Sequence, residues 1–412
     1  MIPIGDLDRG KVREIDLGGA EFKADARRHL AEWATRPPFY VLDNGPPQVV
    51  VGRYADVQAV FADPVRFSSE VPRGKGYEQF DKFVGSQFLT QMDGERHARL
   101  RRLLMSAFSS RRLAQLETRI VEIIGSLLDD IEREGPAFDA MSQYAARLVV
   151  GVLLTAMMNL DEAQRRILLD FQEMQPQLTA TRPGQPFAPE VMAAYDRMAG
   201  LVRDLIADRR TGSRPDLQSD FLGDLVVARD AGDRLDDREL FDMIFGVSAA
   251  IATTPRSGAG ALYMLYTHPD QLRQLIADPK LVPAAVEECL RIAGNGYFTF
   301  PRIATCDTEV GGTSILTGMI VRPSPQAANY DPTVFEDPLK FDIHRRPARI
   351  MTFGAGPHHC IGNALGRMTL QTGIRQLLAR FPLARLADPN FKPSYGGATG
   401  ELRMRSLPML TH

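Results

Sequence analysis

The stretch between residues 95 and 268 constrains the fold most, because its apolar residues recur with helical spacing almost throughout. Clusters of Gly, Pro and Asp divide the stretch and predict where individual helices begin and end. The predicted helices cover residues 95–108, 114–134, 139–158, 161–175, 189–210 and 236–268. A chain with this much helix is expected to adopt a mainly α fold.

Strand signals are confined to two short regions of the chain. Residues 39–42 and 48–52 flank Asn44-Gly-Pro-Pro, which predicts a hairpin, and residues 297–330 form a second strand-like region. Further helices are predicted at residues 22–36, 54–61, 283–291 and 361–380. Because no repeat, low-complexity tract or linker interrupts these elements, we expect one domain over residues 1–412, mainly α with a small β part.

Charge and cysteine content exclude several classes of protein. Lys and Arg number 49 against 51 Asp and Glu, so neither nucleic acid nor an anionic membrane is an expected partner. Three cysteines are too few for a disulfide framework and favour a reducing compartment. The N-terminus lacks the pattern of a secretory signal, and no uninterrupted apolar stretch reaches the length of a membrane span. We therefore expect a cytoplasmic protein.

The segment from Phe353 to Gly362 carries the strongest functional signal. It reads Phe-Gly-Ala-Gly-Pro-His-His-Cys-Ile-Gly and is followed at once by a predicted helix. Its glycines permit tight turns and close approach of the backbone. A thiolate that accepts backbone N–H hydrogen bonds is less basic and can serve as a metal ligand. The single cysteine of the loop, Cys360, is therefore a candidate ligand.

This segment resembles the haem-ligand loop of the cytochrome P450 family, whose pattern is Phe-x-x-Gly-x-His/Arg-x-Cys-x-Gly. Every position of that pattern is filled here. The resemblance implies the cytochrome P450 fold, a single triangular helical domain enclosing a buried haem b, with Cys360 as axial ligand and Phe353 and Gly362 in the cofactor site. A zinc site built from His358, His359 and Cys360 is the competing interpretation, but no second suitably spaced pair of ligands is present.

The resemblance also implies a set of residues that support the haem. Glu288 and Arg291 match the Glu-x-x-Arg helix of the family, and Arg345 matches the arginine that joins this pair. These three are expected to hold the scaffold of the loop. The residues that match the positions contacting the haem propionates are His97, Arg101, Arg302 and His358. Such bases would offset the cost of burying two carboxylates.

The helix expected over the distal face of the haem departs from the family pattern. Thr253 matches the threonine that takes part in proton delivery, whereas Ala252 replaces the usual acid. Pro255 lacks the N–H that would bond the carbonyl of Ile251, so a break in the helix is expected there. The freed carbonyl could hold a water beside Thr253 that replaces part of the relay; alternatively, Pro255 is a tolerated kink without function.

The substrate pocket and the electron source are also sketched by the resemblance. The candidate pocket residues are Phe80, Phe83, Phe88, Ala249, Tyr297, Phe298, Phe300 and Thr399. Their aromatic character favours a small apolar or aromatic substrate. The chain lacks a dinucleotide motif, a flavin module and four clustered cysteines, so a separate ferredoxin and its reductase are the expected donors. Arg111, Arg112 and Arg367 are candidates for a docking patch.

Three functions follow from these residues. The first is a haem-thiolate monooxygenase that uses O₂ and two external electrons to hydroxylate or dealkylate an organic molecule. The second keeps the haem but replaces the chemistry, as a peroxide-driven oxygenase or a nitric oxide reductase, because Ala252 removes the distal acid. The third is a haem-binding or ligand-sensing protein without turnover.

Overall fold

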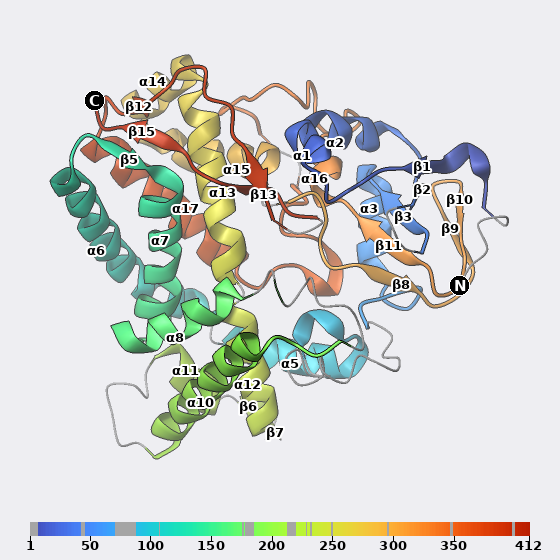
Figure 1. The fold of residues 1–412 in the computed structure, drawn as a ribbon, viewed down its shortest axis with the longest axis horizontal. Coiled ribbons are helices and arrows are strands. Elements are labelled where there is room, and N and C mark those ends of the chain that lie inside the picture. The colour runs from blue at the N-terminus through green and yellow to red at the C-terminus, as the bar shows by residue number, and fades with distance from the viewer. Residues whose placement is uncertain are drawn as a thin grey trace. The chain divides into compact units, whose positions relative to one another are not determined.

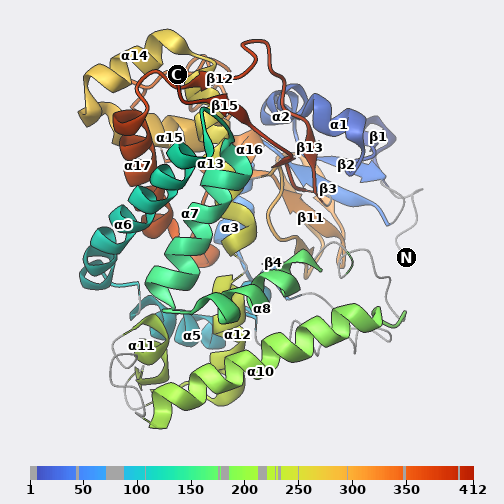
Figure 2. The ribbon, with the colours of Figure 1, turned by 60° about the vertical axis from the view of Figure 1, so that its left-hand side comes forward.

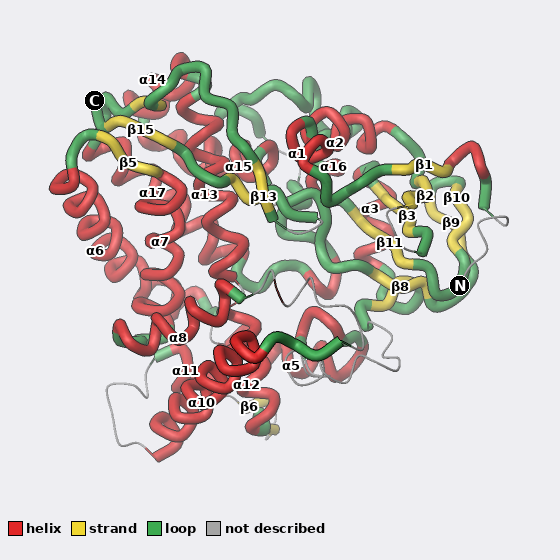
Figure 3. The backbone as a smooth tube through the Cα atoms, in the orientation of Figure 1, coloured by secondary structure: helices red, strands yellow, loops and turns green. Residues whose placement is uncertain are grey.

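A computed structural model describes residues 7–42, 46–70, 88–106, 108–174, 177, 185–211, 220–227, 229–230, 233–248, 250–294, 296–346, 349–397 and 400–412. Helices dominate these residues, and the strands are short (Figure 1, Figure 3). The chain divides into two compact units. Unit 1 comprises residues 1–70, 125–146 and 254–412, and unit 2 comprises residues 71–124 and 147–253. The expectation of a single domain stays a prediction.

Unit 1 contains a mixed sheet of six strands. In spatial order the strands are β1 (Val12–Glu14), β2 (Phe39–Leu42), β3 (Gln48–Val51), β11 (Ile320–Pro323), β8 (Arg302–Ala304) and β4 (Phe67–Ser68). β2 and β3 pair antiparallel, with Phe39 opposite Val50, so the predicted hairpin is confirmed. β11 then pairs parallel to β3. The sheet thus joins the N-terminal hairpin to the second strand-like region.

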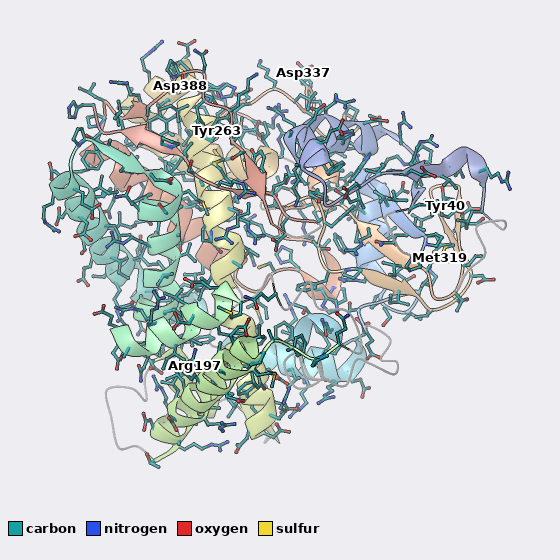
Figure 4. All side chains as sticks on the ribbon, viewed as in Figure 1. Tyr40, Arg197, Tyr263, Met319, Asp337 and Asp388 are labelled. Carbon is teal, nitrogen blue, oxygen red and sulfur yellow. The ribbon has the colours of Figure 1, made fainter. Side chains whose placement is uncertain are left out.

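The core of unit 1 forms where helix α3 (Tyr54–Ala62) packs on this sheet. Val57, Val60 and Phe61 of α3 are buried with Val49 and Val51 of β3 in one hydrophobic cluster. Burial of each such side chain contributes roughly 1.5–3 kcal/mol. The sheet is also tied to a neighbouring hairpin. Figure 4 labels Tyr40 on β2, whose hydroxyl donates to the carbonyl of Ser314 at 2.7 Å.

The remaining strands of unit 1 form small pairs. β9 (Thr308–Val310) and β10 (Thr313–Ile315) make a hairpin whose turn places Gly311 and Gly312 at φ of 56° and 80°. The other strands are β5 (Ala137–Asp139), β12 (Arg385–Leu386), β15 (Pro408–Leu410), β13 (Tyr395–Gly396) and β14 (Arg403–Met404). β15 lies between β12 and β5, and β13 pairs with β14. The β9–β10 hairpin lies in the predicted strand-like region 297–330. The sequence did not predict the pairing of β15 with β5 and β12 or that of β13 with β14, because strands of two or three residues have no measurable period.

Helices cover the rest of unit 1. They are α1 (Ala20–Ala24), α2 (Ala26–Thr35), α14 (Pro269–Ala277), α15 (Val282–Ile292), α16 (Pro325–Ala328) and α17 (Asn363–Arg380). α15 packs against α17. α14 was missed by the sequence analysis, although Pro269 stands in its first turn as helix starts favour. The α15–α17 contact matters most below, because it flanks the segment that contains Cys360.

The described residues of unit 2 are mostly helical and include the short strand pair β6 (Arg229–Asp230) and β7 (Asp233–Arg234). Its helices are α5 (Gly94–Ser106), η5 (Gly151–Met157), α8 (Glu162–Glu173), α10 (Pro189–Thr211), α11 (Phe221–Val227) and α12 (Asp237–Ser248). α8 starts with a capping box between Asp161 and Gln164. The long helix α10 packs against α8, α11 and α12 (Figure 2). Its end is held by the buried ion pair Arg209–Asp220 at 2.5 Å.

Three helical segments cross the boundary between the units. They are α6 (Ser110–Glu134), the stretch formed by η4 (Ala140–Ala146) and α7 (Arg147–Val150), and α13 (Ala250–Tyr266). α13 runs through Pro255 without interruption, so the expected break at that residue is wrong. Helical residues on both sides hold the backbone in place although Pro255 cannot bond the carbonyl of Ile251.

One segment has the length and apolarity of a membrane span. Within the described residues, the helical stretch Ala140–Met157 has a mean hydropathy of 1.3 over 18 residues, although Ser142, Gln143 and Arg147 interrupt its apolar run. Most of the segment is buried inside the protein. Core helices of water-soluble proteins satisfy the same criteria, so the segment does not by itself indicate a membrane protein.

Candidate functional site

The loop that carries Cys360 is shaped by two glycines in unit 1. Gly354 and Gly356 have φ of 69° and 66°, a conformation that other residues rarely adopt. A Cβ atom on Gly356 would lie 2.1 Å from the carbonyl oxygen of Phe61, so the loop runs directly against α3. The N–H of Cys360 donates to the carbonyl of Phe353 at 2.9 Å, which closes the loop. Cys360 is thereby fixed just before helix α17.

The environment of Cys360 suits a thiolate. α17 begins at Asn363, so the positive end of its dipole lies close to Cys360. A Cβ atom on Gly362 would lie 4.0 Å from the sulfur of Cys360, so Gly362 lies within van der Waals distance of the sulfur. Cys360 is exposed in the protein alone, whereas burial raises the pKa of the Cys289 thiol and disfavours its thiolate. Cys360 is therefore the better candidate ligand.

Arg367 connects this loop to α15. Its guanidinium lies 4.4 Å from the centre of the Phe353 ring and forms two hydrogen bonds with the carboxylate of Glu287. It also donates to Asn363 at 3.0 Å, and Asn363 donates to the carbonyl of Cys360 at 2.8 Å. Sequence reasoning missed Glu287 and Asn363. The spacing of Asn363 and Arg367 by four residues on a predicted helix was the available signal.

The predicted scaffold residues Glu288, Arg291 and Arg345 come together as expected. Glu288 and Arg291 are fully buried and form two hydrogen bonds of 2.7 and 2.8 Å. Arg345 approaches the same carboxylate at 3.2 Å. Both arginines also donate to the carbonyl of Lys340 in the coil that follows α16. This hydrogen bonding is what buried charges require.

The four bases predicted to hold haem propionates are divided between the units. In unit 1, Arg302 is buried on β8 and donates to the carbonyl of Phe300, while His358 Nε2 lies 3.0 Å from the hydroxyl of Ser69. In unit 2, His97 and Arg101 share helix α5, and His97 is buried. Within each unit, the bases stand on ordered elements, as a cofactor site requires.

Comparisons with known proteins decide the family. The family model described as Cytochrome P450 matches residues 34–406. Mycinamicin IV hydroxylase/epoxidase of Micromonospora griseorubida is 34% identical over 360 residues, which are 86% of each protein. Nocardicin C N-oxygenase of Nocardia uniformis is 36% identical over 82% of this chain and 83% of that protein.

This chain belongs to the cytochrome P450 family. Solved P450 structures agree. The bacillaene polyketide synthase P450 PksS of Bacillus subtilis superposes with a TM-score of 0.85 at 27% identity, over 96% of this chain and 99% of that chain. The LnmA hydroxylase of Streptomyces atroolivaceus gives 0.79 at 32% identity, over 94% and 96%. The fold is the P450 fold, and the protein is a P450 monooxygenase.

The P450 family binds haem through a cysteine axial ligand. The loop around Cys360 fits this cofactor, because it offers an exposed thiol on a glycine-shaped turn and a following helix N-terminus. When bound, haem supplies the redox chemistry by which O₂ is activated, and a thiolate ligand increases electron density for that step. Within the described residues, no three His, Cys, Asp or Glu side chains are grouped as a zinc site would require.

The predicted distal residues lie on α13. The hydroxyl of Thr253 donates to the carbonyl of Ala250 at 3.3 Å, a bond within its own helix. Ala252 provides no ionisable group. Ile251 is buried, and its carbonyl receives no N–H from Pro255. A polar side chain that sequence reasoning did not consider, Arg256, follows one turn later on the same helix.

The predicted pocket residues have varied surroundings. Tyr297 is fully buried, and its hydroxyl donates to the carbonyl of Leu17. Phe298 stacks on Trp33 at 5.6 Å, whereas Phe300 is 51% exposed. In unit 2, Phe88 packs edge-to-face on Phe245 at 5.6 Å. Phe80, Phe83, Ala249 and Thr399 lie outside the described residues.

Two of the three predicted docking arginines are engaged by carboxylates. Arg112 forms an ion pair with Asp224 in unit 2, and Arg367 forms one with Glu287 in unit 1. Each positive charge is thus balanced locally, which weakens its contribution to a basic patch. Within the described residues, Arg111 alone of the three forms no ion pair with a carboxylate.

Proposed function

We propose that this P450 is a cytoplasmic monooxygenase that hydroxylates or dealkylates a small apolar or aromatic organic molecule. Two electrons would come from a separate ferredoxin through its reductase. The observation that carries the proposal is the glycine-shaped loop that presents Cys360 beside the N-terminus of α17. We assign Cys360 as the axial ligand, with Phe353 and Gly362 completing its surroundings.

The supporting roles follow from charge and burial. Arg302 and His358 in unit 1, and His97 and Arg101 in unit 2, would pair with the two haem propionates. Positive or hydrogen-bonding side chains at such positions offset the desolvation of the carboxylates. Glu288, Arg291 and Arg345 act on the scaffold alone, because their hydrogen bonds are satisfied by one another and by backbone carbonyls.

Proton delivery is assigned to the start of α13. Thr253 would hold a proton-donating water at its hydroxyl, and the carbonyl of Ile251 could accept from that water because Pro255 leaves it without its helical donor. Ala252 has no ionisable group and cannot relay a proton, whereas the family usually has an acid at this position. Delivery through this helix should therefore be slower than through a helix with a carboxylate.

The substrate class is supported by the relatives. Those named above include a hydroxylase/epoxidase of mycinamicin IV and an N-oxygenase of nocardicin C, and a further relative is the 6-deoxyerythronolide B hydroxylase of Saccharopolyspora erythraea. The last is 31% identical over 90% of this chain and 92% of that protein. We infer a secondary metabolite as the substrate of this P450.

A second function is favoured by one observation, the alanine at position 252. Without a distal carboxylate, chemistry that needs less proton delivery from solvent becomes competitive. A peroxide-driven oxygenase or a nitric oxide reductase would satisfy this condition. Both retain Cys360 as ligand and differ from the first proposal in the source of electrons.

The test has two stages. The Soret band of the reduced carbon monoxide complex should report thiolate ligation in the wild type, and Cys360→Ser should lose that band while Cys306→Ser keeps it. Turnover of compounds that shift the haem spin state should then be measured under two conditions. One supplies ferredoxin, reductase and O₂, and the other supplies hydrogen peroxide alone. Product with peroxide only would favour the second function. Thiolate ligation in the Cys360→Ser variant would overturn the assignment of the ligand.

A further inference from the structure

Arg256 is a buried cation that the proposed chemistry does not use. It lies on α13 in unit 1, and its side chain is only 8% exposed. Its guanidinium forms an ion pair with Glu401 at 3.0 Å, and the carboxylate of Glu401 is 36% exposed. A buried guanidinium of this kind needs hydrogen-bond acceptors for its N–H groups.

One of these groups, Nε–H, lacks an acceptor among the described residues. It is buried, and no oxygen of the described residues lies within hydrogen-bonding distance. Buried N–H donors are nearly always paired in folded proteins, and an exception asks for an explanation such as a bound group. This pairing could not be predicted from spacing, since Arg256 and Glu401 lie far apart along the chain.

The ion pair also connects α13 to the segment that carries the candidate pocket residues Tyr297 and Phe298. Arg256 follows Thr253 by three residues on α13. Glu401 forms a β-bridge with Gly296, and the N–H groups of Tyr297 and Phe298 donate to the carbonyl of Gly400 at 2.9 and 3.4 Å. Residues 296–298, at the start of a segment with candidate pocket residues, are therefore joined to Gly400 and Glu401 beside this pair.

We propose that Arg256 Nε–H recognises a neutral hydrogen-bond acceptor of the substrate, a ketone, ester or lactone carbonyl. This inference rests on the proposed function, since it names the substrate class of the same site. Glu401 already balances the charge of Arg256, so a carbonyl completes the hydrogen bonding without adding charge. A substrate carboxylate would place a second anion beside Glu401, which low-dielectric surroundings disfavour.

Glu401 acts as a positioning residue in this arrangement. The backbone of the β13–β14 connection approaches it closely, because a Cβ atom on Gly397 would lie 2.7 Å from its Oε2. Lys23 of α1 donates to the carbonyl of Gly397 at 2.5 Å and anchors the same connection. Because Glu401 forms the ion pair with Arg256, removal of the charge at Glu401 should leave Arg256 as an uncompensated cation that attracts anions.

The experiment measures binding rather than turnover. Three probes share one shape: phenylcyclohexane, 4-phenylcyclohexanone and 4-phenylcyclohexanecarboxylate. Their Kd values are obtained by isothermal titration calorimetry and by spin-state titration of the haem-loaded protein. In the wild type we expect the ketone to bind about tenfold more tightly than the hydrocarbon, the scale of one buried hydrogen bond. The carboxylate should bind more weakly than the ketone.

The variants separate the parts of the proposal. Arg256→Met should lose the ketone preference and keep the Kd of the hydrocarbon. Arg256→Lys keeps the charge and lacks the Nε donor, so it should lose the preference as well, even if Arg256→Met fails to fold. Glu401→Gln should improve carboxylate binding about tenfold. Arg403→Met, on the exposed face of β14, is the matched control and should change none of these values.

Two outcomes would overturn the inference. One is a ratio of ketone to hydrocarbon Kd that is the same in wild type and Arg256→Lys. The other is no binding of the ketone at all. Failure of the proposed function is distinguishable, because it appears as loss of the thiolate Soret band in the wild type, independently of any probe.

Discussion

Glu287 and Arg367 are joined across α15 and α17 by two hydrogen bonds, of 2.5 and 3.1 Å. The same guanidinium covers the ring of Phe353 and bonds Asn363, which in turn holds the carbonyl of Cys360. Arg367 is therefore a support of the cysteine loop. Any contact that it makes with a redox partner must compete with Glu287.

The first prediction follows from this support. Glu287→Gln and Asn363→Ala should each loosen the loop by about 1 kcal/mol, the scale of one hydrogen bond. The carbon monoxide complex should then lose its thiolate Soret band at lower urea concentrations than in the wild type. Glu309→Gln, an exposed carboxylate on β9, serves as control. If Glu287→Gln instead only tightens ferredoxin binding, Arg367 acts in docking and not in the loop.

The second prediction concerns the buried scaffold. Glu288→Ala would leave Arg291 buried without its carboxylate, which costs roughly 3–5 kcal/mol. Urea unfolding followed by circular dichroism should show this loss, with a smaller loss for Glu288→Gln, which keeps the hydrogen-bonding shape. Equal stabilities of Glu288→Ala and the Glu309→Ala control would contradict the role of Glu288.

Cysteine chemistry provides the third prediction. Burial raises the pKa of the Cys289 thiol, so at neutral pH it stays protonated and shielded. In haem-free protein, iodoacetamide should alkylate Cys306 and Cys360 and spare Cys289, as read by peptide mass spectrometry. Haem loading should protect Cys360 alone. Unchanged labelling of Cys360 after haem loading would argue against its role as ligand.

The fourth prediction concerns pH. Burial raises the pKa of Asp242, partly opposed by Arg238 at 2.9 Å, and Asp242 Oδ1 has no partner among the described residues. A raised folded pKa means that the stability associated with this group is present at low pH and is lost as pH rises through that pKa. Asp242→Asn should therefore raise Tm at pH 7–8 and have little effect near pH 4. A Tm gain that is constant with pH would refute this assignment.

The fifth prediction tests proton delivery. Ala252→Asp restores a carboxylate one residue before Thr253 and should increase the product formed per electron consumed. Ala163→Asp adds the same charge to an exposed position of α8 and should have no effect. The ratio of product to consumed NADH, with a ferredoxin system, measures the difference. No gain with Ala252→Asp would mean that delivery does not limit this enzyme.

How much the sequence predicted depended on the range of the interactions. The β2–β3 hairpin is local, so the two strand runs and the turn residues between them were sufficient to predict it. The Glu288–Arg291 pair is local as well, but it was assigned through the resemblance to the family's Glu-x-x-Arg helix. Arg256 and Glu401 are brought together by tertiary packing, and no pattern within a helix indicates such a partner. The same holds for Glu287 with Arg367, and for this reason Arg367 was interpreted as a docking residue.

The short strands and the helix at Pro255 were not predicted correctly, for other physical reasons. The strand pairs β12–β15 and β13–β14 are too short to show alternation, and their pairing is fixed by segments elsewhere in unit 1. Pro255 predicted a break because intrinsic propensity opposes a helix there, yet α13 continues through it. Tertiary packing of a helix on both sides of a proline can outweigh the roughly 3 kcal/mol of that propensity.

The contacts that hold the cysteine loop also set the order in which the protein can be completed. His358 meets Ser69 across 289 residues, and the backbone of Arg349 meets the hydroxyl of Tyr54 across 295. At ribosomal elongation rates, Ser69 and Tyr54 are synthesised on the order of 15 to 60 s before their partners. The cofactor loop can therefore form only after its own residues are synthesised, so a nascent chain cannot hold the haem while only the N-terminal hairpin and α3 exist.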